Sequence, residues 1–236
     1  MSKKHVLLLR LSGPLQAWGV DSRFAVRDTL REPSKSGVLG LVCAALGRSR
    51  DHPIHDLAAL RMGVRADQEG TVLRDYHVAG VGGYMRASGT VERKTVIPGN
   101  RYYLADARFL VALEGGDDAL LNEAHEALRD PVWPLFLGRK ACPPGEPVWL
   151  ADGLQPATSL DAALEGYPWL APAWIPDGER PHRLRLVLED PEGPQVRPDQ
   201  PLSFAQRRFA NRRVSTTFCP RPSLCLEEVN ECTSPA

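Results

Sequence analysis

The sequence from Glu32 to Gly47 reads Glu-Pro-Ser-Lys-Ser-Gly-Val-Leu-Gly-Leu-Val-Cys-Ala-Ala-Leu-Gly. Pro33 disfavours a helical backbone at the residue before it, and Ser34 is a residue type that commonly caps a helix N-terminus. Gly47 is well placed to end the helix. The apolar residues between these limits recur at helical spacing on one broad face, at Val38, Leu41, Val42 and Leu46. We therefore predict a buried helix over residues 34–47 that packs against a sheet.

The start of this predicted helix is a candidate anion site. The first amide groups of a helix have no partner within the helix and attract negative charge. Lys35 and Ser36 stand beside these amides, while Gly37 and Gly40 leave the first turns without side-chain bulk. A nucleic-acid backbone could therefore come close. The alternative is an ordinary capped core helix, and the two interpretations do not exclude each other.

The composition restricts the possible functions. The chain has 236 residues, and its 29 Lys and Arg balance its 29 Asp and Glu, so any binding to nucleic acid must come from local basic patches. No apolar run is long enough for a membrane span or a signal peptide, which predicts a cytoplasmic protein with no membrane partner. The cysteines are odd in number and form no Cys-x-x-Cys pair, so we expect no disulfide framework, no metal site and no cofactor. They are Cys43, Cys142, Cys219, Cys225 and Cys232.

The hydrophobic pattern predicts further elements on both sides of the first helix. The expected order is strand, helix, strand, strand, helix and strand, which is the α+β ferredoxin-like (RRM-like) βαββαβ arrangement. Two helices would then cover one face of an antiparallel sheet and leave the other face open as a platform for RNA. The predicted strands are residues 5–12, 61–67, 71–77, 101–113 and 133–138, and the predicted helices are 34–47, 54–60 and 117–128.

Residues 78–100 differ in character from their surroundings. They are rich in glycine, show no core pattern and carry the basic residues Arg93 and Lys94. We predict a protruding β-hairpin, or thumb, with Tyr84, Met85 and Arg86 as its candidate contacts. The alternative is a disordered surface loop, and the glycines alone do not distinguish the two.

The domain organisation follows from these elements. Residues 1–145 are predicted to form the ferredoxin-like domain, including the thumb. The following region is rich in proline, which predicts an irregular C-terminal extension over residues 146–218 that contains strands and packs on the same domain. A short helix is expected at 159–164 and a strand at 183–188. We expect residues 219–236 to be a flexible tail.

Basic and aromatic residues suggest a binding function. Each basic cluster taken alone is more often a solvated surface. In combination with the aromatic residues Trp18, Phe24, Tyr84 and Tyr102, however, the clusters would supply the phosphate contacts and stacking surfaces that hold single-stranded RNA. The clusters are Lys35; Arg86 with Arg93 and Lys94; Arg139 with Lys140; and Arg207, Arg208, Arg212 and Arg213.

Three segments together resemble one family: Gly13-Pro-Leu-Gln-Ala-Trp-Gly19, residues 33–47, and Pro134-Leu-Phe-Leu-Gly-Arg-Lys-Ala-Cys-Pro-Pro144. Asp75-Tyr-His77 and Tyr103-Leu-Ala-Asp-Ala107 fit as well. From the first strand to about residue 218, the sequence is similar to the CasD family. Members of this family are the subunit of the type I-E CRISPR Cascade complex that holds the 5′ handle of the guide RNA (crRNA).

The resemblance implies a RAMP-superfamily subunit with a ferredoxin-like domain and a thumb. It implies that the protein binds the crRNA 5′ handle, caps the filament of CasC backbone subunits and contacts the large subunit CasA. Target DNA would be recognised only through the complex. Type I-E members leave RNA cleavage to a separate subunit, CasE, so we expect no catalytic residue and no enzyme. The residues assigned to RNA binding are Gln16, Trp18, Arg23, Arg27, Ser34, Lys35, Ser36, Arg93, Lys94, Arg101, Arg139, Lys140, Arg208 and Arg212.

A different class of function stays open as the alternative. His77 or Tyr76, acting with Lys94, could serve in a metal-independent endoribonuclease that processes CRISPR repeat RNA. A polar cluster at a strand end is the more ordinary interpretation of these residues. The Asp and His residues in 51–56 match no standard set of metal ligands, so they do not favour a metal enzyme.

Overall fold

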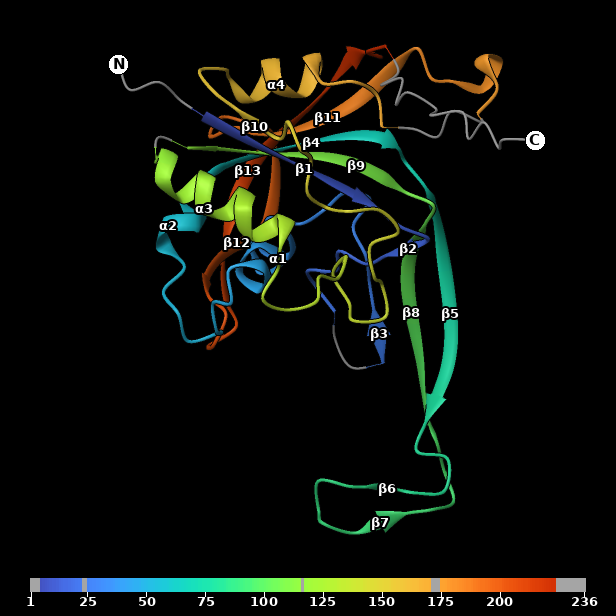
Figure 1. The fold of residues 1–236 in the computed structure, drawn as a ribbon. Coiled ribbons are helices and arrows are strands. Elements are labelled where there is room, and N and C mark those ends of the chain that lie inside the picture. The colour runs from blue at the N-terminus through green and yellow to red at the C-terminus, as the bar shows by residue number, and fades with distance from the viewer. Residues whose placement is uncertain (1–4, 23–24, 116, 171–174, 224–236) are drawn as a thin grey trace, which may run out of the picture.

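A large antiparallel sheet dominates the α+β fold (Figure 1). The computed structural model describes residues 5–22, 25–115, 117–170 and 175–223. The sheet has seven strands in the order β10-β1-β9-β4-β11-β13-β12, and every neighbouring pair is antiparallel. Its strands are β1 (His5–Ser12), β4 (Arg61–Gln68), β9 (Arg108–Gly115), β10 (Leu154–Gln155), β11 (Arg183–Glu189), β12 (Gln195–Ser203) and β13 (Arg208–Pro220).

Two helices cover one face of this sheet. The predicted first helix is confirmed as α1 (Lys35–Ala45), with Ser34 as its N-cap and Gly47 in the left-handed conformation (φ +68°) just beyond its end. The predicted second helix is α3 (Asp118–Arg129), capped by the Asp117 carboxylate. These helices enclose a core with alternate residues of the central strands, and the short α2 (His55–Ala58) lies between α1 and β4.

The other face of the sheet is also covered, so the expected open RNA platform is wrong. Helix α4 (Leu160–Gly166), which begins at its N-cap Ser159 as predicted, packs with the buried Trp169 against Val6 and Leu8 of β1. The reason lies in the sequence of β1, whose apolar residues face both sides of the sheet without alternation. A strand of this kind requires cover on both faces. A short 3-10 turn, η1 (Asp177–Glu179), precedes β11.

A long two-stranded ribbon leaves the body at one end of the sheet (Figure 1). It consists of β5 (Thr71–Ala79) and β8 (Ile97–Ala105), and its tip holds the small hairpin of β6 (Tyr84–Met85) and β7 (Val91–Glu92). We call residues 71–105 the arm. At its base, β8 also pairs with β2 (Leu15–Gln16) and β3 (Val26–Arg27).

The arm corrects two expected boundaries. The predicted strand 101–113 is two strands, because the backbone turns at Asp106, which has a positive φ of +56°. The projection therefore begins at residue 71 rather than 78. No helix within the described residues is both long and apolar enough to cross a lipid bilayer.

Two other expectations are wrong. Residues 133–138 form no strand, because Leu137 bonds instead to Ala17 and Cys142 in a loop that turns at Gly138. The strand that follows α3 in the sheet is the short β10. Cys219 is not part of a loose tail but lies buried in β13, while residues 224–236 of the predicted tail lie outside the described residues.

Candidate nucleic-acid interface

The N-terminus of α1 attracts an anion as predicted, but the anion is a carboxylate of the chain itself. The Lys35 backbone N–H donates to Asp199 Oδ2 at 2.7 Å, and the Gly37 N–H donates to the Ser34 hydroxyl. The Lys35 ammonium is buried and lies 3.0 and 3.1 Å from the two carboxylate oxygens of Glu189. Burial lowers the pKa of Lys35, although the Glu189 carboxylate opposes this effect. Lys35 is thus inaccessible, and we withdraw its assignment as a phosphate ligand.

Four other predicted RNA-binding residues, Gln16, Trp18, Ser34 and Arg212, are buried as well, and Ser34 is the N-cap described above. Arg212 forms a two-pronged pair with Asp199, at 2.7 and 3.0 Å. Gln16 donates to the carbonyls of Leu11 and Ala107 and accepts a hydrogen bond from the Trp18 indole. The polar groups of Gln16, Trp18 and Arg212 are therefore satisfied inside the protein, and these residues have no polar group free for RNA.

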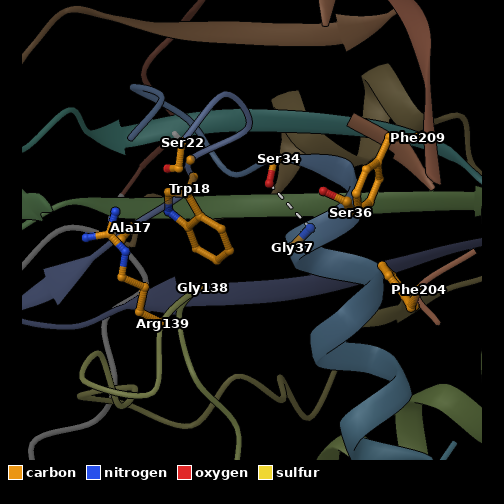
Figure 2. Close-up of a pocket in the computed structure, with 11 residues that line it drawn as sticks. Ala17, Trp18, Ser22, Ser34, Ser36, Gly37, Gly138, Arg139, Phe204 and Phe209 are labelled. Carbon is orange, nitrogen blue, oxygen red and sulfur yellow. Dashed lines mark hydrogen bonds between the residues drawn. The ribbon is translucent and has the colours of Figure 1, made fainter. Parts of the chain in front are cut away.

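A pocket of about 240 Å³ opens between the start of α1 and two loops. Figure 2 shows Arg139 at one side of it and the rings of Phe204 and Phe209 at the other. Its lining combines aromatic surface, hydroxyl groups and one guanidinium, which are the groups that hold a nucleotide. The lining residues are Ala17, Trp18, Gly19, Ser22, Ser34, Ser36, Gly37, Gly138, Arg139, Phe204 and Phe209.

Glycines allow the walls of this pocket to meet. A Cβ atom on Gly138 would lie 1.8 Å from the carbonyl oxygen of Ala17, and the φ of Gly138 is +91°. A Cβ atom on Gly37 would lie 2.9 Å from the ring of Trp18. Gly138 therefore lies where two backbone segments are in contact, and Gly37 lies where the backbone of α1 contacts an indole ring.

Arg139 joins the pocket to the base of the arm. Its guanidinium donates to the carbonyl oxygens of Asp28, at 2.8 Å, and Tyr102, at 3.1 Å, and it stacks over the ring of Tyr103. Within the described residues no carboxylate pairs with Arg139. The wall of the pocket therefore carries a positive charge that no carboxylate of the described part of the chain neutralises.

Predicted residues from three segments meet around this guanidinium. Arg27 of β3 and Arg101 of β8 are register partners, and Arg139 bonds to the residue that follows each of them. Lys140 is the next residue and is exposed, as are Arg27 and Arg101. We call these four residues, Arg27, Arg101, Arg139 and Lys140, the basic cluster.

The remaining predicted residues lie apart from the basic cluster. Arg93 and Lys94 are exposed near the tip of the arm. In the tip, Met85 is 74% exposed, Tyr84 is half-buried and Arg86 pairs with Glu92. Arg208 is exposed at the start of β13, next to Phe209 of the pocket, and Ser34 and Ser36 line the pocket. Arg23 and Phe24 lie outside the described residues.

The sequence analysis missed several pocket residues, including Ser22, Phe204 and Phe209. The two phenylalanines flank the basic segment after β12, so aromatic residues beside arginines were an available signal. What the sequence did not show is that this segment folds back to the start of α1.

The residues of the alternative ribonuclease hypothesis, Tyr76, His77 and Lys94, do not lie together at one site. Tyr76 and His77 are neighbours on β5, so their side chains point to opposite faces of the ribbon. The His77 ring packs by Gly99, whereas Lys94 lies beyond the ends of β5 and β8 in the tip. In the described part of the chain, no group of three or more His, Cys, Asp or Glu side chains could hold a metal ion.

Comparisons with known proteins identify the family to which the chain belongs. Residues 6–215 match the family described as CRISPR-associated protein (Cas_Cas5). The chain therefore belongs to the Cas5 family of CRISPR-associated proteins, and the resemblance to CasD found in the sequence is confirmed.

Similar proteins include one curated relative and two solved structures. The chain is 33% identical over 224 residues to the CRISPR system Cascade subunit CasD of Escherichia coli strain K12, which covers 89% of this chain and 94% of the relative. A solved chain described as a CRISPR RNA-guided surveillance complex has 33% identity and a TM-score of 0.75, covering 92% of this chain and 91% of its own. A crystal structure described as a Cas protein has 45% identity and a TM-score of 0.74, covering 92% and 98%.

Proposed function

We propose that this protein is a non-catalytic subunit of a CRISPR RNA-guided surveillance complex and binds the 5′ handle of the crRNA. The observation that carries the proposal is the pocket at the start of α1, whose aromatic walls and hydroxyl groups adjoin the uncompensated charge of Arg139. One handle nucleotide would stack on Phe209 in the pocket, and the basic cluster would hold the phosphates on either side.

We further interpret the fold as a ferredoxin-like unit with an added sheet extension and a thumb. The support is the order β10-β1-β9-β4, with α1 after β1 and α3 after β9, which matches the expected βαββαβ connectivity. The arm would be the thumb, which contacts the first CasC backbone subunit and the RNA. CasA would adjoin the handle, and target DNA would be reached through the complex.

The non-catalytic role is supported by the relative named as a Cascade subunit and by the positions of the candidate catalytic groups. His77 and Tyr76 face opposite sides of an exposed ribbon, away from the pocket lining. A base and an acid that act on one phosphodiester need to converge on it.

Binding of handle RNA to the purified protein tests the proposal. Phe209→Ala should weaken binding of an RNA oligonucleotide with the handle sequence by about 1–3 kcal/mol, because a stacking surface is lost. Lys140→Ala should flatten the dependence of log Kd on log salt by about 0.7, because one phosphate contact is lost. Both are measured by fluorescence anisotropy across a salt series.

The matched control is Arg50→Ala, which removes an exposed charge beyond the C-terminal end of α1, away from the pocket. Its salt dependence should equal that of the unmodified protein. If Phe209→Ala and Lys140→Ala both bind the handle as the unmodified protein does, the pocket and the basic cluster are not the RNA site.

A further inference from the structure

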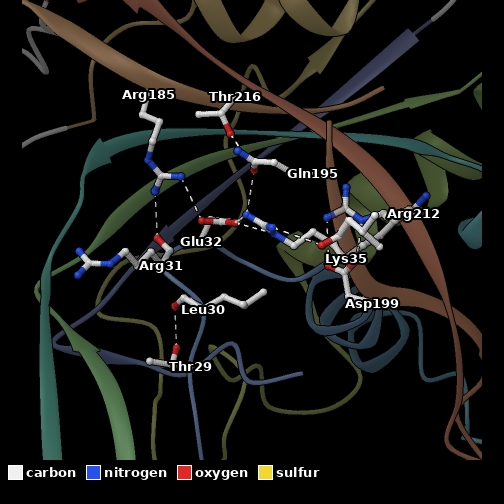
Figure 3. Close-up of polar contacts among 12 residues, drawn as sticks. Thr29, Leu30, Arg31, Glu32, Lys35, Arg185, Gln195, Asp199, Arg212 and Thr216 are labelled. Carbon is white, nitrogen blue, oxygen red and sulfur yellow. Dashed lines mark hydrogen bonds and ion pairs between the residues drawn. The ribbon is translucent and has the colours of Figure 1, made fainter. Parts of the chain in front are cut away.

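The turn that leads into α1 is held from both sides by the C-terminal strands (Figure 3). On one side, Lys35 donates through its ammonium to Glu189 of β11, at 3.0 and 3.1 Å, and through its backbone N–H to Asp199 of β12, at 2.7 Å. Arg212 of β13 fixes the Asp199 carboxylate in place. Three strands thus converge on one residue.

On the other side of Pro33 the same arrangement recurs with the charges reversed. The Glu32 carboxylate accepts hydrogen bonds from Arg185 of β11, at 3.1 Å, and from Arg197 of β12, at 2.8 and 3.1 Å. Arg185 also pairs with Glu69, which follows β4. We call the six residues Glu32, Lys35, Arg185, Glu189, Arg197 and Asp199 the ionic clamp.

Burial makes this clamp sensitive to displacement. Glu32 is 5% exposed, Lys35 1% and Asp199 0%. A buried charge is tolerated only while it is paired and hydrogen-bonded, so a shift of the turn relative to the strands would leave charges unpaired in a poorly solvated place. The clamp therefore fixes the position of the turn relative to the C-terminal hairpin.

Both parts that the clamp joins form walls of the pocket. Ser34, Ser36 and Gly37 belong to the turn and the first residues of α1, while Phe204 follows β12 and Phe209 is the second residue of β13. Two of the segments that line the pocket are thus distant in the sequence, and the ionic clamp is a buried connection between them.

We propose that Glu32 and Lys35 are positioning residues, which set the shape of the RNA pocket through the clamp and thereby its preference for the handle sequence, without touching RNA. This inference rests on the proposed function of the pocket. The exposed basic cluster would continue to bind RNA of any sequence when the clamp is broken. Loss of the clamp should therefore lower the preference for the handle sequence over other RNA. It should have a smaller effect on the salt-dependent affinity for RNA of any sequence.

The test compares handle RNA with a scrambled RNA of the same composition. Lys35→Met should bring the ratio of the two affinities close to unity and leave the salt slope of the scrambled RNA unchanged. Lys35→Met leaves the carboxylates of Glu189 and Asp199 with Arg212 as their shared cation. The double variant with Lys35→Met and Glu189→Gln should recover much of the ratio, because it restores the balance of buried charge beside the turn. If Lys35 instead bound a phosphate, Lys35→Met would reduce the slope of log Kd against log salt by about 0.7. Adding Glu189→Gln would not restore that slope.

A readout without RNA keeps the clamp testable on its own. Amide hydrogen exchange in residues 34–37 and 204–209 should accelerate in Lys35→Met and slow again in the double variant. Should Lys35→Met fail to fold, the same measurements are made on Glu32→Gln and on Glu32→Gln with Arg197→Met, which should show the same loss and recovery.

The two proposals fail in different ways. A preference for handle RNA that survives in a folded Lys35→Met or Glu32→Gln protein, or a loss that the second substitution does not rescue, overturns the clamp. If the unmodified protein shows no preference, or Phe209→Ala does not reduce it, the proposed function fails, and the exchange data alone then decide whether the clamp positions these two segments.

Discussion

Gly138 shows how a single residue can determine a binding surface. Its backbone conformation is left-handed, and the place of its missing side chain is occupied by the Ala17 carbonyl oxygen. The loop that carries Arg139 can therefore lie against the loop that carries Trp18. A side chain at this position would separate the two loops and move the guanidinium away from the base of the arm.

Gly138→Ala should lower the free energy of unfolding by on the order of 1–3 kcal/mol, because the new side chain meets both a strained backbone and a carbonyl oxygen. Urea unfolding followed by circular dichroism measures this change. Gly166→Ala is the matched control, since no atom lies within 4 Å of its added Cβ and its stability should be equal or slightly higher. Equal stability of Gly138→Ala and the unmodified protein would mean that the loops can relax apart.

The arm is the element with the least support from the rest of the fold. Within the residues that the structure describes, its strand β5 pairs only with β8, and eight of its nine residues are exposed. Large apolar side chains are nevertheless concentrated here, including Tyr76 at 62% exposure, Val81 at 79% and Met85 at 74%. Such side chains add little to the stability of the isolated chain and are suited to contact with a partner.

Replacement of residues 81–96 by a short Gly-Ser linker should leave a folded protein with a nearly unchanged thermal midpoint. Incorporation into the RNA-bound complex, measured by co-purification with the neighbouring subunits, should fall sharply. Substitution of Val81, Met85 and Val91 by Ser at full length serves as the comparison and separates loss of apolar contact from loss of length. Unfolding on this replacement, or a normal yield of complex, would contradict the assignment of the arm as a thumb.

At the scale of the whole molecule, the zero net charge is the sum of two groups of charges, those paired inside the protein and those on its surface. The net charge is zero, yet many of the acidic groups are used inside the protein to pair with buried or half-buried Lys and Arg. Arg27, Arg101, Arg139 and Lys140 pair with no carboxylate among the described residues. Basic side chains without a carboxylate partner are therefore concentrated near the pocket in a protein that is neutral overall.

A protein that binds the handle without cutting it should leave repeat RNA intact. We expect no specific cleavage when the purified protein is incubated with CRISPR repeat RNA in the presence of a chelator and the products are separated on a sequencing gel. His77→Ala should behave as the unmodified protein does. Specific cuts that disappear in His77→Ala would instead establish the metal-independent endoribonuclease.

The sequence by itself determined the elements whose signals are local. The caps Ser34 and Asp117 predicted the starts of α1 and α3, and the glycine-rich, basic character of residues 78–100 predicted a projection. The three family segments were also sufficient to indicate the Cas5 class, because they are specific in combination. The caps and the projection depend on interactions between residues close in the sequence. The family assignment depends on the identity of the residues alone.

Only the tertiary structure decided which of the predicted residues are free to bind. Lys35 looks like a phosphate ligand in the sequence, yet Glu189 and Asp199, which are 154 and 164 residues away, neutralise its ammonium and occupy its backbone amide. Arg139, with a similar local signal, meets carbonyl oxygens and a ring and keeps its charge uncompensated. The position of a basic residue in the chain does not show which distant carboxylate the fold brings to it, and burial of that pair determines whether its charge is available to a ligand.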